Sequence, residues 1–353
     1  MKQLVLCLFL LAGIFSGFSQ KAPSVALISG EYEYASMITL PALADYLESE
    51  YAMKTSYFER GHGEDIPKIE KAADADVLIL CIRRMTLPEK QLAVVRNFIK
   101  AGKPVIGIRT TSHAFENWKS WDNEILGGNY HGHHKNHLKT TVSISGDKKH
   151  PLLTNINKGF VSGGSLYEVR PLTKDSTILM TGSVELKGSE PEPVAWTREA
   201  GDSKIMYTAL GFPEDFEQSS FVQFIVNSIY YGLDRSIPSK KASGLSSFPS
   251  RKISIDAFAP LAKHHRTVAL DVRTPGEYAQ GHVKNAVNLN FRSKSLADDL
   301  NKLDKNRPYA VFCRSGGRSA ASTKKMKELG FKFVYDFSGS MNAWEAAGKP
   351  TVK

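Results

Sequence analysis

The chain has 353 residues, of which 42% are apolar and 23% are charged. This length indicates two or three domains, and this composition excludes a disordered or fibrous protein. The formal net charge is +10, and residues 252–353 alone carry 18 Lys and Arg against 9 Asp and Glu. The basic excess therefore belongs to the last third of the chain, where it favours an anionic ligand over a role in solubility alone.

The first residues have the pattern of an export signal. Lys2 precedes an apolar run at residues 4–15, and small residues stand at 17 and 19. This pattern predicts a signal peptide at residues 1–19 that is removed before Gln20. A membrane anchor is the alternative, but the run is short for a span and no second long run follows. We therefore expect a periplasmic or secreted protein without a stable membrane anchor.

The next region, residues 20–235, alternates between strand-like and helix-like segments. Buried-strand patterns occur at 24–29, 75–81 and 103–108, and helical spacing occurs at 36–50 and 88–102. This alternation predicts an α/β domain with a mainly parallel sheet and helices on both faces.

Polar side chains gather in the second half of this region. Arg109 and His113 follow the strand at 103–108, and "HGHHKNH" supplies His131, His133, His134 and His137. We expect Arg109, His113, His131, His133 and His134 to line one ligand cleft. Four imidazoles could bind a transition metal, but no nearby carboxylate or cysteine completes a site. The sequence therefore favours a polar loop, and it predicts neither a metal nor a cofactor.

Two tryptophans lie between these polar groups. Trp118 and Trp121 could stack on a sugar ring or pack in the core, and the core is the commoner place for such residues.

Residues 236–251, "SIPSKKASGLSSFPSR", carry Pro, Ser, Gly and Lys without an apolar period, which predicts a linker. A second domain is then expected at 252–353. Its predicted strands lie at 267–272, 309–313 and 332–337, and its predicted helices lie at 295–303 and 320–330. This domain is also predicted to be α/β with a mainly parallel sheet.

The stretch "CRSGGRS" joins a strand of this second domain to a helix. Cys313 ends the strand, and peptide N–H groups of the following loop can curl around its sulfur. Together with the positive end of the helix, they favour the thiolate and lower its pKa. Glycines permit the tight turn, and arginines offer forked donors for an oxyanion. The predicted substrate-binding residues are Arg314, Ser315, Gly316, Gly317, Arg318 and Ser319. Cys81 ends an apolar run and is expected to be a core residue.

This loop resembles that of the rhodanese family of sulfurtransferases. A second signature of that family, "DVRTPGEYAQGHVKNAVNL", spans residues 271–289, and "SGSMNAW" matches a third segment. The chain departs from the family at Lys284 and Asn285, where Pro-Gly is usual, and at Ser340, which replaces a glycine. The resemblance covers about residues 252–350.

The resemblance implies a double displacement. The Cys313 thiolate would take the outer sulfur of a small anionic donor such as thiosulfate, and a thiol or cyanide acceptor would remove it. It also implies that Asp271 and Arg273 form a pair that supports the loop, and that Glu277 and His282 stand behind it. Surface or capping roles remain the alternative for these four residues.

Loop length separates this chemistry from its nearest rival. Six residues run from Cys313 to Arg318, and phosphatases that share the fold have a loop one residue longer. The shorter loop favours sulfur over a phosphoryl group.

The first domain resembles the ThuA-like family, which shares the glutamine amidotransferase fold. The resemblance is carried by "KPVIGIRTTSHAF", "LGGNYHGHH", "HPLLTNI", "EPVAWTREAGDSKIMYTALGF" and "FVQFIVNSIYYGL". An amidotransferase would carry a cysteine where Arg109 stands, so that activity is not expected. The family often has a histidine there and an Asp-Glu pair where Gly164-Ser165 precede "LY". The resemblance implies a sugar-related ligand.

These patterns predict an exported two-domain sulfurtransferase with Cys313 as nucleophile and no nucleic-acid partner. Two alternatives stay open. One is a carbohydrate-processing protein with an accessory rhodanese-like domain, and the other is a non-catalytic partner-binding protein.

Overall fold

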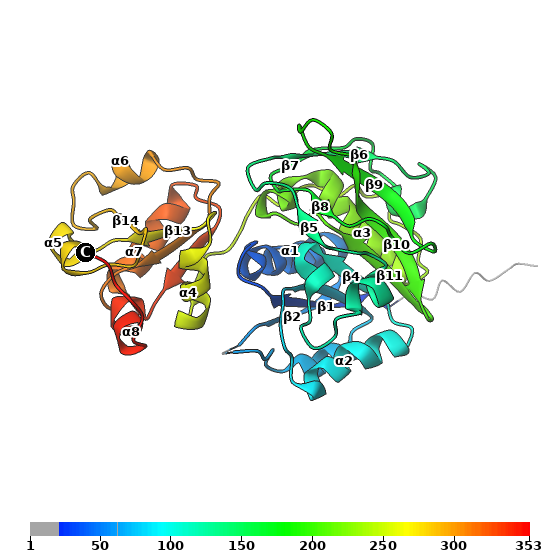
Figure 1. Ribbon diagram of the computed structural model, residues 1–353, viewed down its shortest axis with the longest axis horizontal. Coiled ribbons are helices and arrows are strands. Elements are labelled where there is room, and N and C mark those ends of the chain that lie inside the picture. The colour runs from blue at the N-terminus through cyan, green and yellow to red at the C-terminus, as the bar shows by residue number, and fades with distance from the viewer. Residues whose placement is uncertain (1–20, 62) are drawn as a thin grey trace, which may run out of the picture.

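The computed structural model describes residues 21–61 and 63–353, which form two α/β domains joined by a single segment (Figure 1). The predicted signal peptide at residues 1–19 lies outside the described residues. Within the described part of the chain, every helix is too short or too polar to cross a membrane.

The first domain is built on a nine-stranded sheet in the order β2-β1-β3-β4-β11-β10-β9-β6-β7. Its first five strands are parallel to one another. They are β1 (Ser24–Gly30), β2 (Lys54–Glu59), β3 (Val77–Ile82), β4 (Val105–Ile108) and β11 (Ser203–Thr208). The apolar runs at β1, β3 and β4 are almost fully buried, as strands covered on both faces require.

The other half of this sheet is antiparallel, a feature that the sequence pattern did not predict. Its strands are β10 (Glu192–Ala200), β9 (Thr177–Ser183), β6 (Thr140–Ile144) and β7 (Val161–Ser162). A separate two-stranded ribbon pairs β5 (Gly132–His133) with β8 (Tyr167–Glu168). This ribbon carries part of the histidine cluster.

Helices cover both faces of the parallel half. They are α1 (Ser36–Tyr51), α2 (Glu89–Lys100) and α3 (Ser219–Gly232). The chain passes from β1 through α1 to β2, and from β3 through α2 to β4, in opposite directions along the sheet. Because such crossovers are right-handed, α1 and α2 lie on opposite faces (Figure 1). Short helical turns occupy Arg109–His113, Ile69–Asp74, Asp122–Leu126, Pro151–Leu153 and Pro213–Glu217.

The second domain has a five-stranded, fully parallel sheet in the order β12-β16-β15-β13-β14. The strands are β12 (Arg251–Ile253), β13 (Val268–Asp271), β14 (Val287–Asn288), β15 (Tyr309–Phe312) and β16 (Val334–Phe337). The helices are α4 (Ile255–Lys263), α5 (Pro275–Gln280), α6 (Leu296–Asn301), α7 (Gly317–Glu328) and α8 (Ser340–Ala346). The predicted α/β class of both domains is confirmed.

The segment between the domains packs against its neighbours rather than running free. Ala242, Leu245 and Phe248 are buried, and the rings of Phe248 and Phe333 lie 4.8 Å apart. The three buried apolar side chains therefore hold this segment against the domains, although its composition is otherwise that of a linker.

Charged pairs also join the two domains. Each takes its cation from the second domain and its carboxylate from the first: Arg251 with Glu59 at 2.6 Å, Arg266 with Glu214 at 2.5 Å, and Lys332 with Glu217 at 2.5 Å. Arg266 and Lys332 belong to the basic excess of residues 252–353, so part of that excess serves the attachment of the second domain to the first.

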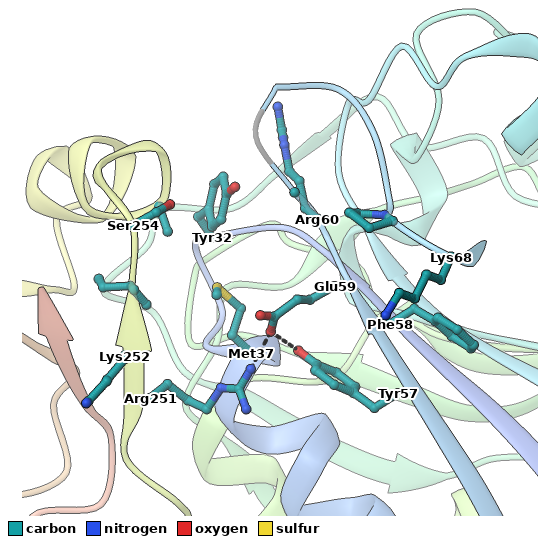
Figure 2. A pocket seen from close by; sticks show the side chains of 14 residues that line it. Tyr32, Met37, Tyr57, Phe58, Glu59, Arg60, Lys68, Arg251, Lys252 and Ser254 are labelled. Atoms are coloured by element: carbon teal, nitrogen blue, oxygen red, sulfur yellow. Dashed lines mark hydrogen bonds and ion pairs between the residues drawn. The ribbon is translucent and has the colours of Figure 1, made fainter. Parts of the chain in front are cut away.

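The Arg251 pair borders a cavity of about 480 Å³ between the domains. Figure 2 shows the Glu59 carboxylate between the guanidinium of Arg251 and the hydroxyl of Tyr57, which donates a 3.0 Å hydrogen bond to it.

Candidate functional site

Cys313 lies at the carboxyl end of the central strand of the second sheet. It follows β15, which runs between β13 and β16. Its carbonyl oxygen accepts a 3.0 Å hydrogen bond from the N–H group of Met341, and the carbonyl of Arg314 accepts one from Asn342. The thiol is buried, with 1% of the residue exposed. The first turn of α8 therefore fixes the backbone on which the thiol stands.

The loop after Cys313 surrounds the sulfur with donors. The N–H group of Gly316 lies 3.1 Å from Sγ. Burial acts to raise the pKa of the Cys313 thiol, but N–H groups of Ser319, Gly316 and Ser315 and the Ser340 hydroxyl outweigh it and lower the pKa. Donors that bond the charged form favour it, so this arrangement favours the thiolate over the thiol.

The two glycines of the loop have different importance. Gly316 has a φ of 99°, and a Cβ there would lie 2.3 Å from the carbonyl oxygen of Ser338, so only glycine fits. Gly317 has no atom within 4 Å of an added Cβ and begins α7 with ordinary backbone angles. The expectation that both glycines are needed for the turn is therefore wrong for Gly317.

Both arginines of the loop are engaged in ion pairs, contrary to their predicted role as free donors for an oxyanion. Arg318 makes two 2.7 Å hydrogen bonds to Glu277, which hold the pKa of that carboxyl well below its usual range. Arg314 pairs at the surface with Glu345 of α8 at 2.9 Å. The negative charge of Cys313, after that of Glu277, also helps to raise the pKa of the Arg318 guanidinium.

The strand next to Cys313 carries the predicted supporting pair. Asp271 and Arg273 form a buried ion pair at 2.7 Å, and Asp271 stands in register with Phe312, the residue before Cys313. The Asn288 amide donates to the carbonyl oxygens of both Asp271 and Arg273. Glu277 reaches the loop through Arg318, and it also closes a capping box with Thr274 at the start of α5.

His282 belongs to a different part of the domain. Its ring stacks on Tyr278 at 3.7 Å, and its backbone pairs with Val352 near the end of the chain. These contacts make it a packing residue beside the C-terminal segment.

Two residues that the sequence analysis did not assign to the site take part in it. The Asp336 carboxylate accepts a 2.7 Å hydrogen bond from the Ser319 hydroxyl, which fixes the end of the loop. The Ser340 hydroxyl accepts a 3.0 Å bond from the Cys313 N–H group and lies 3.7 Å from Sγ and 2.9 Å from the Phe337 carbonyl oxygen. The signal for Ser340 was its departure from a family glycine, since its φ of 52° is one that glycine favours.

In the first domain, Arg109 comes immediately after β4, just as Cys313 comes immediately after β15 in the second domain. This residue has a φ of 49° and is 2% exposed. Its guanidinium lies 3.8 Å from the ring centre of Tyr167 and 4.5 Å from that of Phe212. It donates to the carbonyl oxygens of Ala209 at 2.6 Å and Ser165 at 2.9 Å. Arg109 is therefore an internal cation and not the cleft residue predicted.

The two departures from the family pattern in this domain lie in contact with each other. Ser165 accepts hydrogen bonds from Arg109, and a Cβ on Gly164 would lie 1.9 Å from the ring of Phe212. Gly164 thus leaves room for one ring of the cage, and Ser165 bonds the cation inside it.

The predicted histidines spread around Tyr167 instead of converging. The ring centres of His113 and His133 lie 6.1 and 6.4 Å from that of Tyr167. His113 stacks on Tyr130 at 4.4 Å, and burial followed by the charge of Arg83 lowers its pKa to about 3. His131 is exposed and bonds the Asn129 carbonyl oxygen, while His134 lies 3.4 Å from the Ser189 hydroxyl. Among the residues that the structure describes, no three His, Cys, Asp or Glu side chains gather as metal ligands.

The tryptophans pack in the core. Trp121 is buried and donates to the Thr111 carbonyl oxygen at 2.6 Å, and Trp118 packs against it at 5.1 Å.

Comparisons with known proteins agree with the division of the chain into two domains. The ThuA family model, described as trehalose utilisation, matches residues 27–232, and a rhodanese-like domain model matches residues 255–347. The chain belongs to the ThuA family and carries a rhodanese domain. The suspected fusion is thus confirmed, and the two matches end on either side of the predicted linker.

Sulfurtransferases match the rhodanese domain. The chain is 40% identical over 81 residues to the putative sulfurtransferase YtwF of Bacillus subtilis, which covers 23% of this chain and 76% of that protein. It is 29% identical over 103 residues to the thiosulfate sulfurtransferase GlpE of Shewanella oneidensis, which covers 29% of this chain and 98% of that protein.

The ThuA domain resembles a solved structure in fold. A putative ThuA-like protein from Parabacteroides merdae has a TM-score of 0.50 at 14% identity and covers 64% of this chain and 96% of that one. At this identity the likeness concerns the fold alone.

Proposed function

We propose that this protein transfers sulfane sulfur through a persulfide on Cys313. The observation that carries the proposal is the set of N–H and hydroxyl donors aimed at a buried sulfur. The Cys313 thiolate attacks the outer sulfur of thiosulfate, the S–S bond of the donor breaks, and sulfite leaves with the electron pair. A thiol or cyanide acceptor then attacks the outer sulfur of the persulfide, and the Cys313 thiolate leaves.

Both arginines of the loop are paired with carboxylates, and this makes the proposal for sulfur-donor binding more specific. Because Arg318 is neutralised by Glu277, the anionic end of the donor depends mainly on loop N–H groups near Gly316. Arg318 keeps the loop in shape and adds a cation near the sulfur. Fixed donors of this kind stabilise developing charge without reorganising during the reaction.

Intact mass spectrometry of the purified full chain tests the persulfide. After incubation with thiosulfate, we expect the mass to increase by one sulfur atom, and cyanide should remove it. Cys313→Ser should show no gain, whereas Cys81→Ser should behave as the parent does. A mass gain that persists in Cys313→Ser would contradict the proposal.

The size of the loop supports sulfur transfer over phosphate-ester hydrolysis. A ring of six residues has few donors and a small radius, which suits one sulfur atom and crowds a phosphoryl group. One preparation should therefore be assayed on thiosulfate with cyanide and on an aryl phosphate. Cys313-dependent phosphatase turnover above the sulfurtransferase rate would overturn the assignment.

We also propose that the protein is exported, on the pattern of its first 19 residues. N-terminal sequencing of protein recovered from the periplasm or medium of an expressing bacterium should begin at Gln20. Recovery only from the cytoplasm with an intact N-terminus would contradict export.

A sugar-related ligand on the ThuA domain is the second candidate function. The specific observation is a neutral His113 stacked on Tyr130, with Tyr167 and His133 beside it, since aromatic faces and a neutral imidazole suit a polyol. Trehalose should then raise the melting temperature of the parent and not that of His113→Phe. An equal shift in both proteins would exclude this site.

A further inference from the structure

A separate cavity in the rhodanese domain has a lining unlike that of the sulfur loop. Its volume is about 360 Å³, and it lies between α4, the turn after His282 and the last residues of the chain. The floor is apolar: Val283 and Trp344 are 3% exposed, and Ala259, Ala262 and Pro350 complete it. This volume is within the range of small-molecule sites.

The rim of this cavity is positively charged. Lys263, Lys284 and Lys349 line it and are all exposed, and the lining holds no Asp or Glu. Within the described part of the chain, none of these three lysines forms an ion pair closer than 4.0 Å. In contrast, Arg251, Arg266 and Lys332 of the same domain are paired with carboxylates of the first domain. These three lysines are therefore basic residues of the second domain that do not take part in its ion pairs with the first domain.

One of these lysines stands where the chain departs from its family. Lys284 and Asn285 replace the usual Pro-Gly turn, and Asn285 keeps a φ of 64°, which suits the glycine position. The backbone of the turn is thus retained while a cation is added beside the apolar floor.

From this combination we infer that the cavity binds a small molecule with an apolar ring or short chain and one anionic group, such as an aromatic carboxylate or sulfonate. The ring would lie on Trp344 and Val283, and the anionic group would lie among the three ammonium groups. Burial of the ring supplies most of the affinity, and the lysines select the charge.

The position of Trp344 connects this site with the nucleophile. It lies one turn after Ser340 on α8, and its indole N–H donates to the Pro350 carbonyl oxygen at 3.1 Å. A bound molecule would therefore touch the helix whose first residue bonds Cys313.

The test uses naphthalene-1-sulfonate as the probe and the full chain labelled with 5-fluorotryptophan. The protein has four tryptophans, so the fluorine resonance of Trp344 can be assigned with Trp344→Phe. We expect a saturable shift of the Trp344 resonance with the probe and none with inorganic sulfate. The triple variant Lys263→Gln, Lys284→Gln, Lys349→Gln should bind the probe at least tenfold more weakly.

Matched controls separate this site from the sulfur loop and from general charge. A triple variant of three exposed lysines elsewhere in the domain, Lys294→Gln, Lys324→Gln, Lys325→Gln, should bind as the parent does, and so should Cys313→Ala. Ala262→Leu should fill the floor and weaken binding. Equal affinity in the parent and the rim variant, or equally tight binding of neutral naphthalene, would overturn the inference.

Discussion

Cys313 and Arg109 occupy equivalent places in the two domains. Each is the first residue after a parallel strand in the middle of its sheet, where ligands of α/β proteins usually bind. Around Cys313, backbone N–H groups and a hydroxyl point at the side chain. Around Arg109, backbone carbonyl oxygens and aromatic rings do so.

This difference shows that position in the fold does not by itself create a reactive site. The donors around Cys313 stabilise a thiolate, which exists only when the thiol has lost its proton. The acceptors and rings around Arg109 stabilise a cation that is permanently present. The same edge of a sheet therefore stabilises a negative charge in one domain and a positive charge in the other.

The sharpest test of this contrast is the removal of the thiol. Cys313→Ser should lower sulfur transfer from thiosulfate by roughly a thousandfold or more, because no other group can hold the transferred sulfur. The melting temperature should stay near that of the parent, because the change is nearly isosteric. Full activity in this variant would show that Cys313 does not carry the reaction, and the contrast with Arg109 would fail.

Replacement of Arg109 should have the opposite effect: it should lower the stability of the protein and leave sulfur transfer unchanged. Arg109→Leu leaves the carbonyl oxygens of Ala209 and Ser165 buried without their donor, so we expect a loss of about 3 kcal/mol in the free energy of unfolding. Denaturant titration measures this loss. Sulfur transfer by the folded fraction should be unchanged, and a large fall in its rate would show that the ThuA domain takes part in the reaction.

Ser340→Gly removes one donor from the thiolate while keeping the backbone angle that this position needs. Because the hydroxyl helps to lower the pKa of Cys313, its loss should raise that pKa. The acid limb of the pH–rate profile should move to higher pH, and on that limb a shift of one unit lowers the rate by about tenfold. Rates at high pH should recover. A uniform fall at all pH values would indicate a structural role instead.

The Glu277–Arg318 pair should contribute a smaller, pH-dependent amount to stability. Arg318 holds the pKa of Glu277 below its usual value of 4.5, so this contribution is complete above that value and is lost as the pH falls through the lower folded pKa. Glu277→Gln should cost about 1 kcal/mol at neutral pH, and the cost should shrink in acid. The exposed partner of Arg314 provides the control, since Glu345→Gln should change the stability little at either pH.

The smallest effect is expected at the charged contacts between the domains. The double variant Glu59→Gln, Glu217→Gln removes two half-exposed ion pairs, each with a contribution of about 0.5 kcal/mol. Proteolytic cleavage within residues 236–250 should become a few times faster, while sulfur transfer should not change. Unaltered cleavage would mean that the buried apolar residues of this segment hold the domains together without help from charge.

Much of the second domain could be predicted because its candidate site is built from residues close together in sequence. Cys313, its loop and the following helix are consecutive in the chain, and the parallel strands show as continuous apolar runs. Ser340 and Asp336 were missed as site residues because they reach the loop from the next strand and helix. Only the fold brings them to the sulfur.

The first domain was harder to predict for the same physical reason. Arg109 meets Ser165 and Ala209 across 56 and 100 residues of chain, and no local pattern distinguishes a caged arginine from one that lines a cleft. The antiparallel strands were missed for different reasons: β6 alternates in burial, β7 has two residues, and bulges interrupt the pairing of β9 with β10. The histidines are close in sequence, yet the ribbon that carries some of them turns their rings apart.

Arg251 gives the junction between the domains an unusual property for anyone who wishes to recombine them. Its backbone opens β12 of the rhodanese sheet, whereas its side chain binds Glu59 of the ThuA domain (Figure 2). A truncation that begins at residue 252 removes the first residue of an edge strand, and a transplant that keeps Arg251 introduces a cation in need of a carboxylate. To express either domain alone or in another fusion, the chain should therefore be cut within residues 236–250. The residue at position 251 should then be chosen to suit the side chains that surround it in the new protein.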